Sequence, residues 1–284
     1  MALMTQRQFE DFFEPYAGDV EGFYEAAYWK LSDELVKELI RRHLGVAPGQ
    51  RVLDAGGGTG RWAVWAAEDL GVSVTVADKS RRMLEEAEKI IAASGAEHKV
   101  TRTLCDLQDA PELPDESFDA VISTYGVLSF LDDPAAAFRT LHRVLRPGGQ
   151  ALLMSHSLST ALASKVNSGG STVAELRELN EQRIVRWSEH VPPLRVYTAD
   201  DLRSLAASAG LEAQRVFGVT SVVAPGPQDF GYPYSEISAV SRALEDEEYF
   251  ATALALEIEA SERTEWSERG TNLLLKARKP DAAV

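Results

Sequence analysis

Four glycines fall within five positions of the segment VLDAGGGTG, residues 52–60. Glycine adopts backbone conformations that other residues avoid, so such a loop lets the main chain come very close to a ligand. Asp54 stands just before the glycines, and Asp78 closes the next apolar run about twenty residues further on. A carboxylate at that second position can accept hydrogen bonds from ribose hydroxyls. The pattern indicates a site for a nucleoside-containing cofactor.

The glycine spacing excludes some classes of cofactor but leaves more than one possible. A dinucleotide fingerprint, G-x-G-x-x-G, started at Gly56 would place its last glycine at Arg61; started at Gly58 it reads Gly58, Gly60, Ala63, a permitted match. A triphosphate loop needs G-K-[ST], and the sequence here is G-R-W. Asp54 beside the loop disfavours a pyrophosphate and suits an ammonium group. A nicotinamide dinucleotide therefore stays an alternative in the shifted register.

The elements that must position this loop follow an alternating pattern. Apolar runs at 51–55, 73–78, 99–106, 118–123 and 150–157 alternate with helical segments at 60–71, 80–95 and 133–149. Ser80 is a predicted helix cap, and Gly95 a predicted helix end. Strands alternating with helices of this length predict βαβ units and a parallel sheet with helices on both faces.

Three parts of the chain depart from the alternation. Residues 1–48 read as helical segments, the second of them capped by Ser32 and ended by Gly45. We expect residues 1–48 to form an N-terminal helical cap and residues 49–284 to form the main domain. Insertions are expected at about 157–197 and 219–270, the second with one long helical run over 236–263. Between and after them, 198–212 reads as a helix begun by Thr198, and 213–220 and 271–280 as strands.

Composition restricts the partners. The 284 residues carry a formal net charge of −15, and that field repels nucleic-acid backbones. No apolar run reaches the length of a membrane helix, and the first residues lack the pattern of a secretory signal. The single cysteine, Cys105, excludes an internal disulfide. We expect a cytoplasmic protein with a small-molecule partner, without nucleic acid, membrane or metal; its oligomeric state stays open, a homodimer being one option.

Five segments, taken together, resemble the class I S-adenosylmethionine (SAM)-dependent methyltransferases. They are VLDAGGGTG, VADKSRRMLEEA, CDLQDAPELPDESFDAVIS, LRPGGQALLMS and YTADDLRSLAASAGLEAQRVFG, in the family's order and spacing. The resemblance covers about residues 20–155 and 197–218, with a last strand at 272–279. It implies a Rossmann-like α/β fold: a seven-stranded, mostly parallel sheet, helices on both faces and a helical lid. It also implies SAM as cofactor and S-adenosylhomocysteine as product.

The resemblance assigns the cofactor contacts. The positions are Tyr28, Asp54, Gly56, Gly58, Gly60, Asp78, Lys79, Met83, Asp106, Leu107 and Thr124. The glycines would line the methionine part and the ribose, Asp54 would steady the loop or hold the amino group, and Asp78 would bind the ribose hydroxyls. Asp106 and the Leu107 backbone would meet the adenine, which Lys79 and Met83 would border. For Tyr28 and Met83, plain core packing is an equal reading.

Few residues are required for the chemistry itself. The positive sulfur of SAM makes its methyl group electrophilic, so positioning for in-line displacement supplies much of the rate. A general base is needed only if the acceptor must lose a proton. His156, at the end of the fifth predicted strand, is the first candidate, and His190 the second; His142 reads as structural. Tyr125, with Thr124, ends the fourth strand, where the family places groups near the sulfonium.

The preferred function is methyl transfer to an O, N or C atom of a small molecule. Three alternatives stay open: a protein or nucleic-acid methyltransferase, a non-catalytic SAM-binding protein, and a nicotinamide oxidoreductase. The sequence STYG after the fourth strand replaces the N-P-P-Y type of tetrapeptide used on planar amino nitrogens, which disfavours adenine-N6 chemistry.

Overall fold

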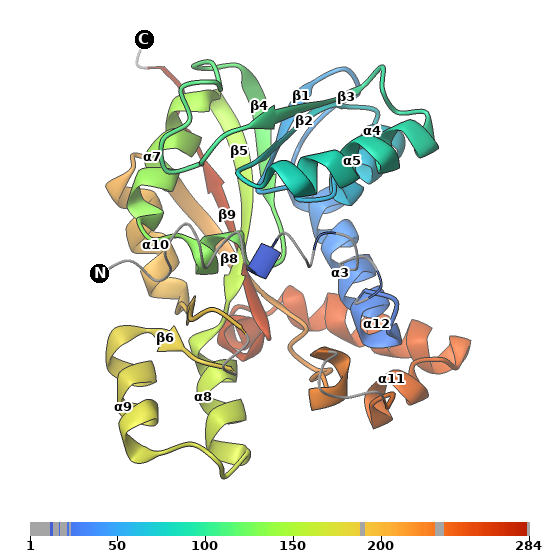
Figure 1. Cartoon of the computed structure of the whole chain (residues 1–284), viewed down its shortest axis with the longest axis vertical. Helices are drawn as coiled ribbons and strands as arrows, with labels where there is room; N and C mark the ends of the chain where they lie inside the picture. The colour runs from blue at the N-terminus through green and yellow to red at the C-terminus, as the bar shows by residue number, and fades with distance from the viewer. Residues whose placement is uncertain are drawn as a thin grey trace.

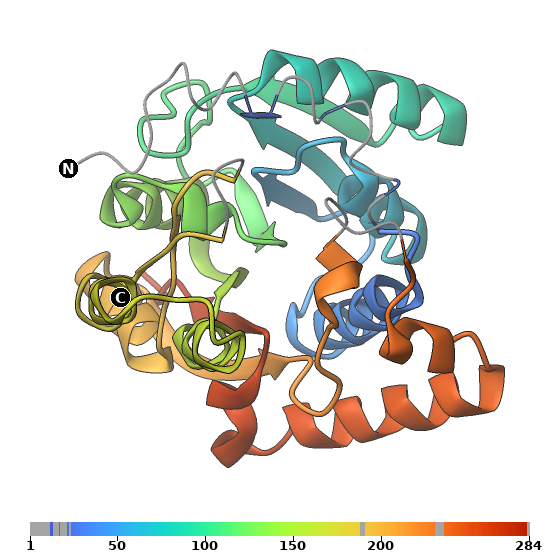
Figure 2. The ribbon, with the colours of Figure 1, turned by 60° about the horizontal axis from the view of Figure 1, so that its bottom comes forward.

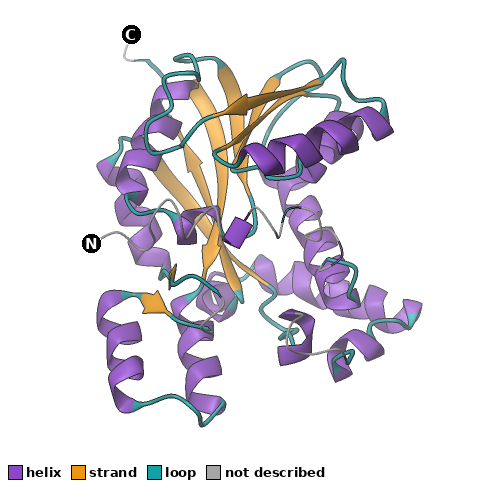
Figure 3. Cartoon of the chain, viewed as in Figure 1, coloured by secondary structure: helices purple, strands orange, loops and turns teal. Residues whose placement is uncertain are grey.

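The computed structural model describes residues 12–13, 17, 22, 24–187, 191–230 and 236–282. Within these ranges a seven-stranded sheet has the order β3-β2-β1-β4-β5-β9-β8 (Figures 1 and 3). Its strands are β1 (Arg51–Ala55), β2 (Ser73–Asp78), β3 (Val100–Leu104), β4 (Phe118–Ser123), β5 (Leu145–His156), β8 (Glu212–Val219) and β9 (Asn272–Arg278). The predicted α/β fold with a mostly parallel sheet is confirmed.

Strand direction fixes where a ligand can bind. The strands β3, β2, β1, β4 and β5 run parallel, whereas β9 is antiparallel to both β5 and β8. The strand order reverses between β1 and β4, because β2 and β3 lie on one side of β1 and the later strands lie on the other. Ligands of open α/β sheets bind beyond the carboxyl ends of the strands at such a switch point.

Helices cover both faces of the sheet. One face carries α3 (Ala27–His43), α4 (Arg61–Asp69) and α5 (Arg81–Ser94), and the other carries α7 (Pro134–Val144) and α10 (Ala199–Ser208). Neighbouring strand residues point to opposite faces, so Leu152 joins the first core and Leu153 the second. Both are buried, which is why the strands read as continuous apolar runs.

Two inserted units extend from the carboxyl edge of the sheet. The first holds α8 (Leu158–Asn167), α9 (Val173–Gln182), and the short strands β6 (Ile184–Val185) and β7 (Leu194–Arg195), with a small core of its own. The second holds η1 (Pro227–Phe230), α11 (Ala239–Ala243), α12 (Glu247–Ser261) and η2 (Thr264–Arg269). Figure 1 shows them on opposite sides below the sheet, and Figure 2 shows α11 and α12 beside α3.

Local predictions met mixed outcomes. The hydroxyls of Ser80 and Thr198 cap α5 and α10, and Gly95 ends α5 in the left-handed conformation, as predicted. Ser32 is not a cap: α3 begins five residues earlier, and the buried Ser32 hydroxyl is hydrogen-bonded to the Tyr125 phenol. The expected helix over 236–263 is two helices, because the chain turns at 244–246 and Asp246 caps α12.

Further differences concern the first insertion and the N-terminus. The sequence LSTALASKVN forms α8, which its weak pattern did not predict. Within the expected insertion at about 157–197, α9 ends at Gln182 and the chain then enters β6. Most of the predicted first N-terminal helix lies outside the described residues; within them, α3 shares its core with the sheet. The domain boundary at residue 48 stays a prediction.

A buried carboxylate anchors the second insertion to the sheet. Glu257 of α12 is fully buried and accepts hydrogen bonds from three consecutive backbone N–H groups, those of Ser221, Val222 and Val223, at 2.6–3.0 Å. These residues come after β8 with only Thr220 between, where the chain leaves the sheet. A carboxylate can satisfy several N–H donors at once, so Glu257 compensates backbone groups that folding removes from water.

We predict that Glu257→Ala lowers the free energy of unfolding by about 2–4 kcal/mol, because it leaves buried N–H groups without an acceptor. Chemical denaturation monitored by circular dichroism measures the change. Glu259→Ala is the matched control, since Glu259 is an exposed residue of the same helix. Equal stability of the two variants would contradict the anchoring role.

Candidate cofactor and acceptor site

The glycine loop reverses the chain sharply between β1 and α4. Gly56, Gly58 and Gly60 have φ values of +72°, +53° and +74°, a region that strongly favours glycine. The loop is fixed to the end of β2, because the N–H groups of Gly56 and Gly57 both donate to the Ala77 carbonyl, at 2.7 and 3.2 Å. The loop therefore lies at the carboxyl ends of β1 and β2, next to the switch point between β1 and β4.

Asp78 is held in place by the same loop. Its carboxylate accepts hydrogen bonds from the Gly58 N–H at 3.0 Å and the Ser80 N–H at 2.8 Å, one on each oxygen. Each oxygen can accept a further hydrogen bond, so the carboxylate is oriented and still able to receive two hydroxyls. Burial raises the pKa of Asp78, which these backbone donors oppose. This geometry suits the vicinal hydroxyls of a ribose.

Asp54 is a fully buried acid without a partner in the described protein. It is 0% exposed, and neither carboxylate oxygen has a hydrogen-bond partner among the described residues. Gly57 makes room for it, since a Cβ there would lie 2.5 Å from Oδ2. Burial, and then the nearby charge of Asp78, raise the pKa of Asp54 to about 7, although the charge of Arg61 and the backbone N–H of Ala63 act in the opposite direction. A group so placed gains from a positively charged donor, which an amino-acid ammonium supplies.

The predicted adenine contacts lie at the ends of β2 and β3. The Met83 sulfur approaches within 3.9 Å of the position of a Cβ on Gly58, so this side chain borders the glycine loop. Leu107 is buried, and Lys79 is partly exposed beside Asp78, whose pKa its charge lowers. Asp106 is partly exposed.

Gln108 is a residue that sequence reasoning missed. Its backbone N–H donates to Asp106 Oδ1 at 2.9 Å, and its amide nitrogen lies 3.1 and 3.2 Å from the two carboxylate oxygens. Its own amide oxygen accepts from the Asp133 backbone at 2.6 Å. Gln108 therefore fixes the direction of Asp106 and ties it to the start of α7. No motif signals this role.

Tyr125 stands in a strained turn after β4. Its φ is +49°, uncommon for a residue with a side chain and typical of functional sites. The phenol donates to the Asp33 carboxylate, its oxygen lies 3.1 Å from Ser32 Oγ on α3, and burial raises its pKa. Thr124, just before it, is buried. Helix α3 and the end of β4 are thus joined beside the glycine loop.

Arg61 completes this connection, a role that no sequence motif indicates. It is the first residue of α4 and forms a two-pronged ion pair with Asp33 at 2.6 and 3.1 Å. Its guanidinium carbon lies 4.0 to 5.4 Å from ring centroids of three aromatic residues, Tyr24, Trp62 and Tyr125. Such cation–π contacts stabilise a desolvated guanidinium.

His156 ends β5 at the same edge. A Cβ on Gly126 would lie 2.9 Å from its Nε2, so the imidazole packs against the turn that follows Tyr125. Its backbone N–H donates to Ser129 Oγ at 3.1 Å. Burial lowers the pKa of His156 to about 4, which leaves the imidazole neutral at physiological pH. His142, a residue of α7, packs beside Gly210. His190 lies outside the described residues.

Tyr28 lies in a different set of contacts from the glycine loop. It is 0% exposed, and its phenol is hydrogen-bonded to Thr220 Oγ1 at 2.7 Å, at the end of β8. Its backbone N–H donates to Ser241 of α11 at 3.1 Å. These contacts give it a structural role between α3 and the second insertion, and its contact with a cofactor stays a prediction.

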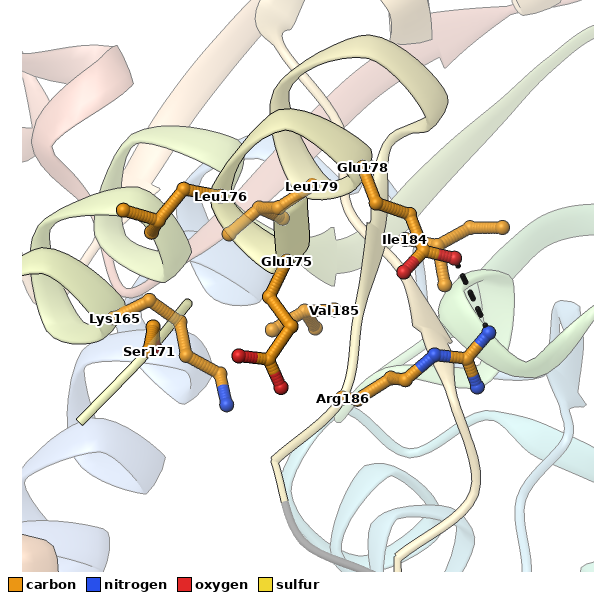
Figure 4. Close-up of a pocket in the computed structure, with 9 residues that line it drawn as sticks. All are labelled: Lys165, Ser171, Glu175, Leu176, Glu178, Leu179, Ile184, Val185 and Arg186. Atoms are coloured by element: carbon orange, nitrogen blue, oxygen red, sulfur yellow. Dashed lines mark hydrogen bonds and ion pairs between the residues drawn. The ribbon is translucent and has the colours of Figure 1, made fainter. Parts of the chain in front are cut away.

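A small cavity in the first insertion is unrelated to this edge (Figure 4). Its volume is about 10 Å³, at the limit for one water molecule. Lys165 of α8 and Glu175 of α9 line it, and the 3.3 Å ion pair of Glu178 and Arg186 closes one side. It is too small for a methyl acceptor.

Two kinds of feature are absent from the described residues. They contain no helix that is both long and apolar enough to cross a bilayer. They also contain no cluster of three or more histidine, cysteine, aspartate or glutamate side chains with the geometry of a metal site.

Known proteins that are similar to this chain include methyltransferases. Residues 52–149 match a family model described as a methyltransferase domain. Methyltransferase GfsG of Streptomyces halstedii is 31% identical over 200 residues, 68% of this chain and 64% of that protein. The tRNA 5-carboxymethoxyuridine methyltransferase of Escherichia coli strain K12 is 30% identical over 171 residues, 58% of this chain and 62% of that protein.

A solved structure shows the same fold. Geranyl diphosphate methyltransferase in complex with SAM superimposes with a TM-score of 0.57 at 20% identity, covering 87% of this chain and 85% of that one. The match over residues 52–149 shows a domain of the methyltransferase family, and the sheet order and the superposition show that the chain has the fold of the class I SAM-dependent methyltransferases. The chain covers just under two thirds of the length of the two curated relatives.

We predict that affinity for S-adenosylhomocysteine rises about tenfold between pH 5.5 and 7. The reason is that Asp54, with a pKa of about 7 in the free protein, must be ionised to attract the ligand's ammonium group. Calorimetric titration across this window measures the effect. Asp54→Asn should bind more weakly and lose the slope. A wild-type affinity independent of pH would show that Asp54 does not sense the ammonium.

Proposed function

We propose that this protein transfers the methyl group of SAM to a small-molecule acceptor. The observation that carries the proposal is the pair of acids flanking the glycine loop: Asp54, buried without a partner, and Asp78, oriented by two backbone donors. An ammonium and a ribose at the two ends of one ligand would satisfy both. A dinucleotide would bring a pyrophosphate towards Asp54, where like charges repel.

Different residues of the site would bind the cofactor and border the reacting centre. SAM, when bound, supplies an electrophilic methyl group on a positive sulfur. Asp78 would bind the ribose hydroxyls, Asp106 the adenine amino group, and Asp54 would favour the ammonium. Tyr125 and Thr124, at the end of β4, would border the reacting centre and help exclude water from it. Orienting the reactants in this way accounts for much of the rate in a displacement that needs no other activation.

His156 is proposed as the general base for an acceptor that carries a proton. Its low pKa keeps the imidazole unprotonated at physiological pH, so a nitrogen lone pair is available. It would accept the acceptor's proton as the new bond to carbon forms, and release it to solvent afterwards. A base this weak suits an acceptor whose acidity rises as it is methylated, such as a hydroxyl or the N–H of a neutral nitrogen.

The choice of a small molecule rests on charge. A net charge of −15 repels a polyanionic RNA, and non-specific RNA affinity depends on basic side chains. The name of one relative describes it as a tRNA methyltransferase, so a tRNA acceptor is the competing proposal. A non-catalytic SAM-binding protein is the second alternative, although the glycines and acids of the cofactor site are all present.

We expect calorimetry to show binding of SAM and S-adenosylhomocysteine and none of NAD. Asp78→Ala should weaken binding by about 1.5–3 kcal/mol, the loss typical of hydrogen bonds to a charged group. Asp109→Ala, an exposed acid near the same edge, is the control. Failure to bind either SAM-type ligand would refute the proposed cofactor, and an unchanged affinity of the Asp78 variant would refute its ribose role.

Transfer of a radiolabelled methyl group then separates the acceptor classes. The protein is incubated with labelled SAM and either total tRNA or a small-metabolite extract, and each fraction is counted. Label in the small-metabolite fraction alone is expected. Label in tRNA would overturn the small-molecule assignment, and binding without transfer to either fraction would favour a non-catalytic protein.

A further inference from the structure

The end of β5 brings His156 opposite a buried asparagine. In the antiparallel register of β5 and β9, His156 pairs with Asn272, the first residue of β9. Side chains of directly opposed residues project from the same face of a sheet, with their Cβ atoms about 4.5–5.5 Å apart. Asn272 is therefore the closest cross-strand neighbour of the imidazole, although the two are 116 positions apart in the sequence.

The side-chain oxygen of Asn272 can accept a hydrogen bond. The side chain is 2% exposed, and its Oδ1 has no hydrogen-bond partner among the described residues. A buried amide oxygen without a donor costs about 1–3 kcal/mol, so the position calls for a nearby N–H or O–H group. The neutral imidazole of His156 offers one N–H and keeps one lone pair.

The rest of His156 is already held in place. Its backbone N–H donates to Ser129 Oγ, and its carbonyl accepts from the Tyr197 N–H at 2.9 Å. On the ring, Nε2 lies against the Cα side of Gly126. Only the position of the ring proton is left to be set. Two influences act on the pKa of His156: burial lowers it, and the Asn272 side chain raises it, as an acceptor facing a ring N–H does.

We infer that Asn272 is a positioning residue for His156: its Oδ1 receives the ring N–H and so fixes which ring nitrogen keeps its free lone pair. The inference rests on the proposed role of His156 as base. It explains why a polar side chain occupies a buried strand position between two apolar layers. An imidazole with a fixed tautomer offers its lone pair in every molecule, whereas an imidazole that exchanges tautomers offers it in only a fraction.

The first test uses the wild-type chain labelled with ¹⁵N-histidine. Nitrogen chemical shifts report the tautomer of each imidazole, and loss of one signal set in His156→Gln assigns His156. We expect one neutral tautomer from pH 5.5 to 8, without change on adding S-adenosylhomocysteine. Shifts averaged between the two tautomers would overturn the inference. This measurement needs no acceptor, so failure of the proposed methyl transfer leaves its outcome readable.

Two substitutions then test the contact itself. Asn272→Leu removes the acceptor at similar volume and should let the tautomers of His156 exchange. Asn272→Asp places a carboxylate there and should raise the pKa of His156 by about 1–3 units, into the measurable range. Ser155→Ala is the control, because Ser155 precedes His156 on β5 with its side chain on the opposite face.

The outcome is decisive in either direction. The positioning role would be overturned if His156 kept the wild-type tautomer and the wild-type pKa in both Asn272 variants. Should the aspartate variant fail to fold, the leucine variant decides, with retained S-adenosylhomocysteine binding as the check on its fold. Once an acceptor is known, Asn272→Leu should lower kcat about tenfold with little change in KM for SAM.

Discussion

The arrangement of the whole site depends on how the chain leaves β1. Three consecutive N–H groups, those of Gly56, Gly57 and Gly58, donate to the Ala77 carbonyl and the Asp78 carboxylate at the end of β2. This is possible only because Gly56 and Gly58 adopt positive φ values and Gly57 leaves space for the Asp54 carboxylate. The same turn thus orients one acid and buries the other.

Burying an acid such as Asp54 is unfavourable for folding. Binding of a cationic ligand can offset this cost. In the folded protein without ligand, Asp54 keeps its proton up to about pH 7, whereas in the unfolded chain it loses the proton above about pH 4. The contribution of Asp54 to the free energy of folding is therefore least favourable at neutral and high pH. A cationic ligand reverses the balance, because it favours the ionised form. The cost is kept next to the site, where a ligand can offset it.

A second network ties the N-terminal helix to this centre. Asp33 on α3 binds both Arg61, which follows the glycine loop, and Tyr125, which follows β4. Aromatic rings around the guanidinium shield the pair from water. Helix α3 is in turn packed against α11 and α12 of the second insertion, whose anchor is Glu257. Loops and insertions that surround the site are therefore connected to the sheet by buried polar contacts.

Much of the fold could be predicted from the sequence because its signals are local. Apolar runs, the caps at Ser80 and Thr198, and glycines at turns each act over a few residues. The failures have a common cause. Ser32 resembles a helix cap, but its partner is Tyr125, 93 residues away; Asp33, Arg61 and Gln108 carry roles set by tertiary contacts. Helix α8 was missed because its sequence has little periodic pattern and its one buried face packs within the insertion.

The central claim is that Asp78 and the glycine loop form the ribose end of a SAM site. A crystal structure with S-adenosylhomocysteine bound tests it most directly. We predict that both ribose hydroxyls lie within hydrogen-bond distance of the Asp78 carboxylate, with the adenine beside Met83 and the ammonium on the Asp54 side of the loop. A nucleoside bound away from the ends of β1 and β2, or a ribose that makes no contact with Asp78, would contradict the account.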